Sequence, residues 1–171
     1  MKTRFKTTIV MLAFASLISC KNETKNNNSK SDSNTEMSNT VGLSFSDDNV
    51  SKQFQHYIHL KTALVNSDAK EAQSGAKMFI ENTDDTALKG LLYKILDTSD
   101  IEVQRTIFSD VTAKMTAIVE ASISSGEVYQ QFCPMAFNNQ GGYWLSTKEE
   151  IRNPYFGDKM LKCGKVTETI K

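Results

Sequence analysis

Apolar side chains recur at helical spacing over residues 46–124, and this pattern limits the possible folds more than any other feature of the chain. At 100° per residue, the apolar residues of four successive segments each gather on one helix face. Short polar turns separate the segments, so the sequence predicts an all-α or mostly α fold built on an antiparallel four-helix bundle. The four apolar stripes are Val50/Phe54/Tyr57/Ile58/Leu64/Val65, Ala69/Ala72/Ala76/Phe79/Ile80, Leu88/Leu91/Leu92/Ile95 and Ile101/Phe108/Val111/Met115/Ile118/Val119.

Local signals bound the fourth helix and mark a change of pattern after it. Ser99-Asp-Ile-Glu102 has the form of a capping box that begins the helix, and Ser124-Ser-Gly126 ends it. Beyond Gly126 the pattern becomes aromatic and irregular, and Asn138-Asn-Gln-Gly-Gly142 is typical of a hairpin loop. Residues 166–170 suit either a last short strand or coil. We therefore expect an irregular C-terminal segment with a candidate short β-hairpin.

Residues 1–19 have the composition of an export signal, with a basic start and an apolar core too short to span a bilayer. The core ends in Leu17-Ile-Ser-Cys20, which resembles the lipobox of bacterial lipoproteins. The resemblance implies cleavage before Cys20, diacylglycerol on the Cys20 sulfur, and an acyl chain such as palmitate on the new amine. Several acyl chains on one residue anchor a domain stably to a membrane.

The next stretch, residues 20–45, is rich in Asn, Ser and Lys. Between residues 21 and 40 it has no aromatic residue and, apart from Met37, no apolar side chain, so burial cannot offset the entropy of ordering it. We expect a signal peptide over 1–19, a lipidated and disordered tether over 20–45, and a folded helical domain over 46–171. The predicted location is the bacterial cell envelope, on the periplasmic or surface face of the outer membrane, since Lys21 and not Asp follows Cys20.

Sulfur-bearing side chains form two clusters in the C-terminal segment, Cys133 with Met135 and Met160 with Cys163. Soft thiolate and thioether donors select Cu(I) or Ag(I), and Zn(II) less often. If a hairpin brings the two clusters together, they form a mixed Cys/Met metal site.

Two histidines are further candidate metal ligands. His56 and His59 lie three residues apart on the first predicted helix, on the side opposite its apolar stripe. One interpretation is a pair of solvated histidines. The other has the C-terminal loops fold over this face and adds imidazole donors to the sulfurs.

The same cysteines have a second explanation. An exported protein meets an oxidising compartment, where Cys133 and Cys163 would form a disulfide. That bond would close a loop of about 30 residues and stabilise the fold by roughly 3 kcal/mol in the chain-entropy model. Met135 and Met160 would then fill gaps in the core. Structural thiols, a metal site and redox-active thiols stay open as alternatives.

Four C-terminal blocks together resemble a domain family of unknown function that occurs in Gram-negative lipoproteins and as an appendage of periplasmic adaptor subunits of copper and silver efflux systems. The resemblance extends over roughly residues 54–170, with its specificity in these blocks. It implies a helical envelope domain associated with metal resistance, although this chain lacks the barrel and hairpin regions of an adaptor. The blocks are Cys133-Pro-Met-Ala136, Tyr143-Trp-Leu-Ser146, Ile151-Arg-Asn-Pro-Tyr-Phe-Gly157 and Met160-Leu-Lys-Cys-Gly164.

Charge and motifs argue against two classes of function. Three of the 20 basic residues precede Cys20 and none of the 20 acidic residues does, so the rest of the chain is slightly acidic and shows no basic stripe for nucleic acid. No Ser/His/Asp arrangement, zinc-protease motif or dinucleotide fingerprint indicates an enzyme.

Two hypotheses for the function remain. The first is a membrane-tethered Cu(I)/Ag(I)-binding module with an efflux or envelope protein as partner. The second is a structural or protein-interaction lipoprotein with a Cys133–Cys163 disulfide and no metal.

Overall fold

The computed structural model describes residues 42–171. The predicted signal peptide, the lipidation of Cys20 and almost all of the predicted tether lie outside these residues. Among the helices of the described part, none combines the length and the apolar character needed to cross a membrane.

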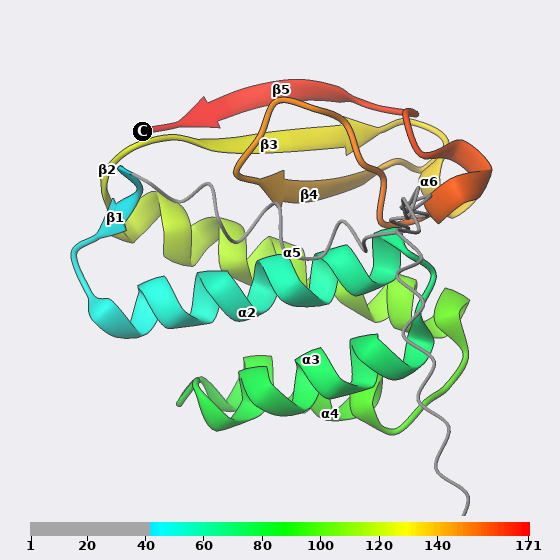
Figure 1. Cartoon of the computed structure of the whole chain (residues 1–171), viewed down its shortest axis with the longest axis horizontal. Coiled ribbons are helices and arrows are strands. Elements are labelled where there is room, and N and C mark those ends of the chain that lie inside the picture. Colours follow the sequence, from blue (N-terminus) through cyan, green and yellow to red (C-terminus); the bar gives the residue numbers. More distant parts are fainter. Residues whose placement is uncertain (1–41) are drawn as a thin grey trace, which may run out of the picture. The chain divides into compact units, whose positions relative to one another are not determined.

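Four long helices come first in the chain, and a small antiparallel sheet follows them (Figure 1). The helices are α2 (Asp48–Val65), α3 (Ala69–Glu81), α4 (Thr86–Leu96) and α5 (Ile101–Ser122). The strands are β1 (Ser44–Phe45), β2 (Ile123–Ser125), β3 (Val128–Cys133), β4 (Gly142–Ser146) and β5 (Lys165–Ile170), with the short helices α6 (Ala136–Asn139) and η1 (Gly157–Met160) between them. The predicted mostly helical class is confirmed.

An aspartate caps the N-terminus of each long helix. The side chains of Asp47, Asp68, Asp85 and Asp100 accept hydrogen bonds from backbone N–H groups of the first turn, which no helical carbonyl can reach. At α5 this differs from the predicted capping box. Asp100, not Ser99, is the N-cap and accepts from the N–H groups of Glu102 and Val103. A carboxylate at this position also interacts favourably with the helix dipole.

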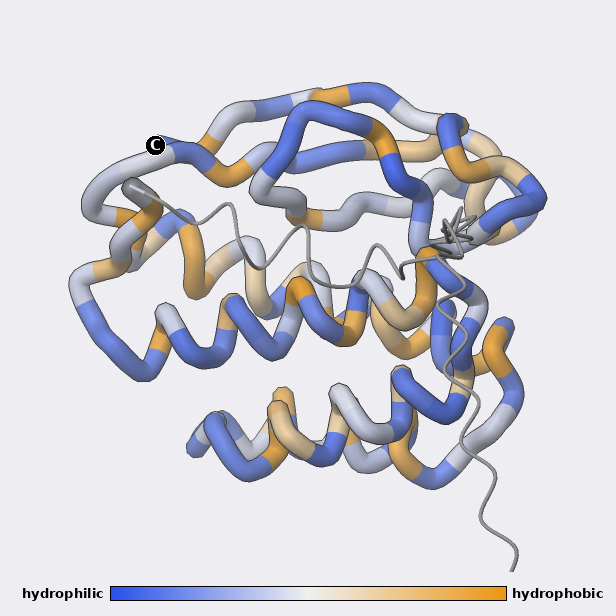
Figure 2. The backbone as a smooth tube through the Cα atoms, viewed as in Figure 1, coloured by the Kyte–Doolittle hydropathy of each residue, from blue (hydrophilic) through white to orange (hydrophobic). Residues whose placement is uncertain are grey.

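The helices and the sheet form layers. The sheet covers one side of α2 and α5, and α3 and α4 lie on the other side of these two helices (Figure 1). Each helix packs on the next in sequence, and α2 also packs on α5. Hydrophobic and hydrophilic positions alternate along the helices, as their periodicity predicts (Figure 2). The antiparallel bundle geometry itself stays a prediction.

The C-terminal segment is more regular than predicted. Its strands are ordered β4-β3-β5, and both neighbours pair with β3 in antiparallel fashion. The predicted hairpin is present as β3 and β4, with α6 in the connection. Of the two alternatives for residues 166–170, strand or coil, the structure shows the strand, β5. The expected irregular structure is present between β4 and β5, where η1 is the one regular element that the structure describes, but β5 adds a third strand to the hairpin that the sequence predicted.

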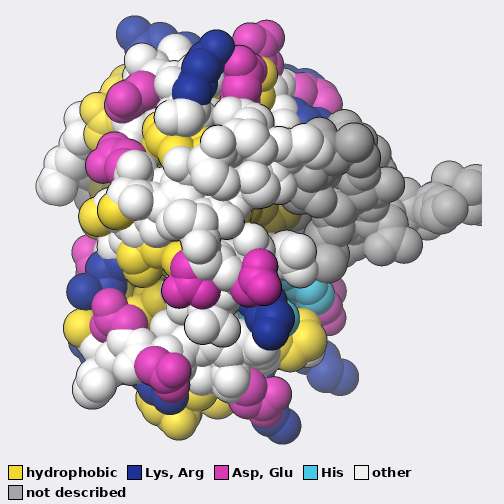
Figure 3. All heavy atoms as spheres, turned by 90° about the vertical axis from the view of Figure 1, so that its left-hand side faces the viewer, with side chains coloured by type: hydrophobic (Ala, Val, Ile, Leu, Met, Phe, Trp, Pro, Cys, Tyr) yellow, Lys and Arg dark blue, Asp and Glu magenta, His cyan; other side chains and the backbone are white. Residues whose placement is uncertain are grey.

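A second strand pair lies at the start of the described chain. In β1, Ser44 pairs with Ser125 and Phe45 with Ile123 of β2, and Phe45 is buried. This strand lies within the stretch that the sequence assigns to the tether. On the side of the molecule where β1 and β2 lie, charged side chains of both signs are interspersed (Figure 3).

A buried tyrosine joins the helices to the sheet. The Tyr57 hydroxyl lies 2.9 Å from Thr112 Oγ1 of α5 and accepts a hydrogen bond from the Leu145 N–H of β4, also at 2.9 Å. Its ring stacks on Phe108 with centroids 5.2 Å apart. Tyr57 therefore holds α2, α5 and β4 in contact at one point of the core.

Candidate thiol and methionine site

The sheet brings the two cysteine clusters together. Cys133 is the last residue of β3, and the pairing of Phe132 with Lys165 places the start of β5 beside it. Cys163 lies two residues before β5, where Asn153 Nδ2 donates to its carbonyl oxygen at 2.8 Å. Two residues 30 apart in sequence thus meet because β3 and β5 are neighbouring strands.

The backbone next to Cys163 has a conformation that favours glycine. Gly164 has φ +151°, and a Cβ there would lie 2.8 Å from the Trp144 ring and 3.1 Å from the Phe132 carbonyl oxygen. Glycine allows this approach because it has no side chain. The close contact holds Cys163 against the end of β3.

The two thiols are in direct contact. Cys133 Sγ and Cys163 Sγ lie 3.0 Å apart, and both cysteines are free. Cys133 is fully buried and Cys163 half-buried. The hydrogen bond with Cys133, with a smaller effect of burial, raises the pKa of the Cys163 thiol. The Cys163 thiol is thus held mainly in its protonated form near neutral pH.

The methionines lie beside the thiol pair but face a different space. Met135 and Met160 both line a cavity of about 420 Å³ between α5, α6 and the loop that carries Tyr155. Met135 is 46% exposed. Neither cysteine lines this cavity. The four sulfur atoms therefore divide into a thiol pair in contact and a thioether pair around an adjoining cavity.

The connection that forms one wall of this cavity has left-handed backbone. Phe137, Asn138 and Asn139 have φ of 52°, 56° and 68°. Asparagine tolerates this region, but a bulky residue such as phenylalanine adopts it rarely and with strain. The Phe137 ring packs edge-on against Tyr155 at 4.9 Å, which holds the strained residue in place.

The histidines do not join the sulfurs. His59 Nε2 lies 2.7 Å from Glu71 Oε1 of α3, and the His56 ring lies 6.2 Å from the Phe79 ring of the same helix. Both histidines are half-buried, because α3 and not the C-terminal loops covers their side of α2. Burial first, and His59 second, lower the pKa of His56. Within the described residues no group of three or more His, Cys, Asp or Glu side chains is placed to hold a metal.

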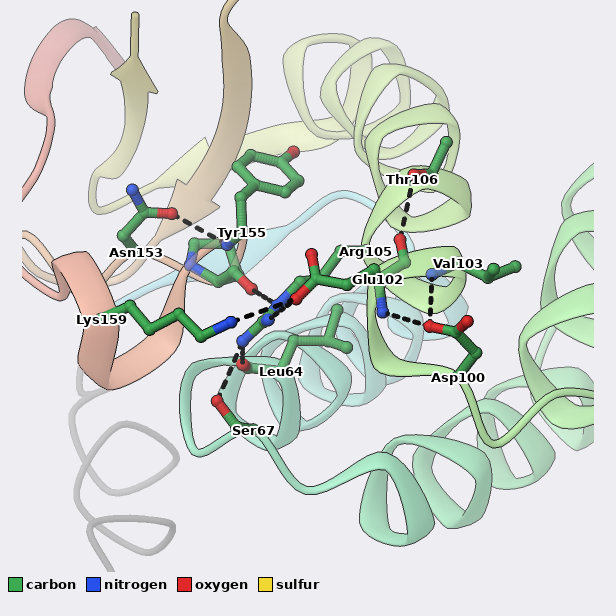
Figure 4. Close-up of polar contacts among 11 residues, drawn as sticks. Leu64, Ser67, Asp100, Glu102, Val103, Arg105, Thr106, Asn153, Tyr155 and Lys159 are labelled. Carbon is green, nitrogen blue, oxygen red and sulfur yellow. Dashed lines mark hydrogen bonds and ion pairs between the residues drawn. The ribbon is translucent and has the colours of Figure 1, made fainter. Parts of the chain in front are cut away.

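The structure shows an arginine at the cavity that the sequence analysis missed. Arg105 of α5 is buried, and Figure 4 shows its guanidinium between the end of α2 and the loop after β4. Its nitrogens donate to the Pro154 carbonyl at 2.8 Å, the Leu64 carbonyl at 3.1 Å and Ser67 Oγ at 3.0 Å. A fourth bond, from Nη1 to Glu102 Oε1, is 2.8 Å long. These hydrogen bonds connect the loop that carries Pro154 and Tyr155, which forms part of the cavity wall, to α2 and α5.

A family model described as a protein of unknown function (DUF3347) matches residues 54–126. No curated protein and no solved structure matches the chain significantly. The matched residues extend from α2 to β2 and end before β3. The match therefore lies on the helices, whereas the resemblance stated from the sequence depended most on the four C-terminal blocks, which the match does not include. Over these residues the chain is similar to a domain family whose function is unknown.

Proposed function

We propose that this protein is a membrane-tethered domain of the bacterial envelope that binds one soft monovalent ion, Cu(I) or Ag(I), at Cys133 and Cys163. The observation that supports this most is the 3.0 Å contact between the two thiols, contributed by separate segments of the chain. Two thiols that already meet need little rearrangement to share one ion, because the fold has brought their segments together.

The chemistry of the donors fits a soft ion. Thiolates are the ligands that Cu(I) and Ag(I) prefer, and thioethers favour the same ions over Zn(II) or Mg(II). Met135 and Met160 lie within three residues of Cys133 and Cys163 in the sequence and line the adjoining cavity, so we propose them as the additional sulfur donors. His56 and His59 have no part in this proposal, since they contact α3. Binding releases the thiol protons, so affinity rises with pH.

The surroundings proposed for this site are those of a lipoprotein. Lipidation of Cys20 would hold the domain at the membrane, and an efflux or envelope protein is the proposed partner for metal transfer. The support for this part is the export signal and the lipobox-like motif of the sequence.

The test is titration of the purified, pre-reduced full chain with Cu(I) against a chromophoric chelator. We expect one tight equivalent in the unmodified protein and none in the double variant Cys133→Ser/Cys163→Ser. The variant Lys162→Ala is the matched control, because it changes an exposed residue next to Cys163, leaves both thiols in place, and is expected to bind the same amount. Equal binding by the double variant and the unmodified protein would refute the proposal.

The methionines are tested separately. Met135→Leu and Met160→Leu are expected to weaken Cu(I) binding without changing its stoichiometry, because the thiolates remain. Met78→Leu on α3 is the control for loss of a thioether elsewhere.

A second candidate function rests on the same contact. If the thiols oxidise in the envelope, the protein is a structural or protein-interaction lipoprotein stabilised by a Cys133–Cys163 disulfide. Alkylation of free thiols in freshly isolated envelopes, followed by mass spectrometry, separates the two candidates. Alkylated Cys133 and Cys163 would count against the disulfide, and a cross-linked peptide pair would support it.

A further inference from the structure

The two thiols of the pair differ in their access to solvent. Cys133 is fully buried at the end of β3, under the residues that pack the sheet on the helices. Cys163 is half-buried in the turn between η1 and β5, next to the exposed Lys162. A reagent from solvent therefore reaches Cys163 first, and reaches Cys133 only through Cys163 or by local unfolding.

From this asymmetry we propose that the pair is an ordered thiol–disulfide exchange site, in which Cys163 accepts the mixed disulfide and Cys133 resolves it. The reaction partner is a disulfide presented from solvent. The proposal concerns redox control of the thiols on which the proposed function rests, and it holds with or without a metal.

The exchange takes two balanced steps. In the first, Cys163 loses its proton to solvent and attacks one sulfur of the partner disulfide, which forms a mixed disulfide and releases one partner thiolate. In the second, Cys133 loses its proton and attacks the Cys163 sulfur, which closes the Cys133–Cys163 bond and releases the second partner thiolate. The pair loses two electrons and two protons, and the partner disulfide becomes two thiols.

The geometry favours rapid resolution. The Cys133 sulfur is already within 3.0 Å of the Cys163 sulfur, so the second step needs little movement of the backbone. The turn that carries Cys163 is held by the Asn153 amide and by the close contact of Gly164 with Trp144. A mixed disulfide on Cys163 thus has its resolving thiol beside it at all times.

The exchange also controls metal binding. In the dithiol form both sulfurs are available to a soft ion, whereas a closed disulfide has no thiolate to offer. The order of attack makes Cys163 the residue through which an external disulfide would switch the site off.

The test exposes the reduced full chain, purified in detergent, to glutathione disulfide and maps adducts on Cys133 and Cys163 by mass spectrometry over time. Cys133→Ser is expected to accumulate a stable glutathione adduct on Cys163. Cys163→Ser is expected to form its adduct on Cys133 at least about tenfold more slowly, because that thiol is buried. The unmodified protein is expected to end as the Cys133–Cys163 disulfide with little lasting adduct.

Two results would overturn the proposal: equal adduct formation in the two single variants, or a lasting glutathione adduct on Cys163 of the unmodified protein. Gly164→Ala keeps both cysteines and serves if a serine variant does not fold, since the displaced turn is expected to prolong the mixed disulfide. The experiment contains no metal. A failed Cu(I) titration with ordered exchange would therefore refute the metal function alone, and the reverse pattern would refute the exchange order alone.

Discussion

Arg105 is a buried charge at which three parts of the chain meet. Its guanidinium bonds the last turn of α2, the Ser67 hydroxyl after it, and the Pro154 carbonyl of the loop after β4. A guanidinium presents five N–H donors in a fixed plane, whereas a lysine has three rotatable donors on one nitrogen. Glu102 lies on the solvent side of the guanidinium and partly offsets its charge. The hydrogen bonds of Arg105 therefore connect the helices to the loop that leads to Cys163.

Replacing Arg105 by methionine is expected to lower the free energy of unfolding by about 2–4 kcal/mol, because buried carbonyl groups lose their donors. Denaturant unfolding measures this. Lys159→Met is the matched control, since Lys159 faces the same Glu102 at 4.0 Å but is largely exposed, and a change below about 0.5 kcal/mol is expected. An Arg105→Met protein as stable as the control would show that the hydrogen bonds of Arg105 contribute nothing to the free energy of unfolding.

His56 gives a pH dependence whose sign follows from its surroundings. Its pKa in the folded protein is lowered from 6.5, mainly by burial, so the unfolded chain binds more protons as the pH falls through that value. The free energy of unfolding is therefore expected to decrease as the pH is lowered from about 7.5 to about 5.5, a range in which the titration of carboxylates still contributes little. His56→Gln should flatten this part of the stability curve. An unchanged slope in the variant would show that Glu81 or another group cancels the effect.

Composition and spacing predicted some of these residues and missed others. The sulfur clusters were visible because cysteine and methionine are few and closely spaced. Contact between Cys133 and Cys163 was an expectation of both the disulfide and the metal hypothesis, but the sequence could not establish it, since it depends on the pairing of β3 with β5. Arg105 had one signal: it lies four residues after Ile101 and three before Phe108, on the apolar stripe of α5, where a charge indicates a buried partner.

At the scale of elements, the hydroxyl of Tyr57 is the polar link between α2, α5 and β4. Tyr57→Phe keeps the packing of the ring and removes the two hydrogen bonds, which leaves the Leu145 N–H buried without this acceptor. We expect a loss of about 1–2 kcal/mol in the free energy of unfolding, measured by thermal and denaturant unfolding.

The control for this change is Tyr129→Phe. The Tyr129 hydroxyl bonds the carboxylate of Glu127 in an exposed position, so its loss is expected to change stability by less than about 0.5 kcal/mol. Equal losses in the two variants would mean that the link between layers contributes nothing beyond a surface hydrogen bond.

The four helices and the β3–β4 hairpin were predictable, whereas β1 and the pairing of β5 were not, for a physical reason. The bonds of a helix join residues four apart, so the apolar stripe and the aspartate before each helix carry most of the information. The bonds of a strand depend on a partner elsewhere in the chain. β1 has only two residues and lies next to a polar stretch, and β5 has two apolar residues, Val166 and Ile170, among polar ones, so neither stands out in the sequence. The contact of the two histidines with α3 was not predicted, because the sequence does not say which face of α2 receives α3.

At the scale of the whole molecule, oxidation of the thiol pair joins the turn before β5 to the end of β3. A disulfide that closes a loop of about 30 residues is expected to stabilise the protein by roughly 3 kcal/mol in the chain-entropy model. The measurement compares unfolding of the oxidised and reduced forms of the same protein. The Cys133→Ser/Cys163→Ser variant is the control and should not respond to reductant. An oxidised form no more stable than the reduced one would argue against a structural disulfide and leave the metal and exchange proposals standing.

The start of the described chain and the thiol pair lie at opposite ends of β3. At one end lies the β1–β2 pair, beside which the described chain begins, and at the other lie Cys133 and α6 (Figure 1). The six residues of β3 separate these ends by about 20 Å. If residues before Gly42 tether the domain to a lipid surface, as proposed, the attachment acts on the end that lacks the sulfurs. Because a disordered tether sets reach and not orientation, the domain would turn freely about that attachment point, and the tether would not crowd the end of β3 at which an incoming molecule meets the thiols.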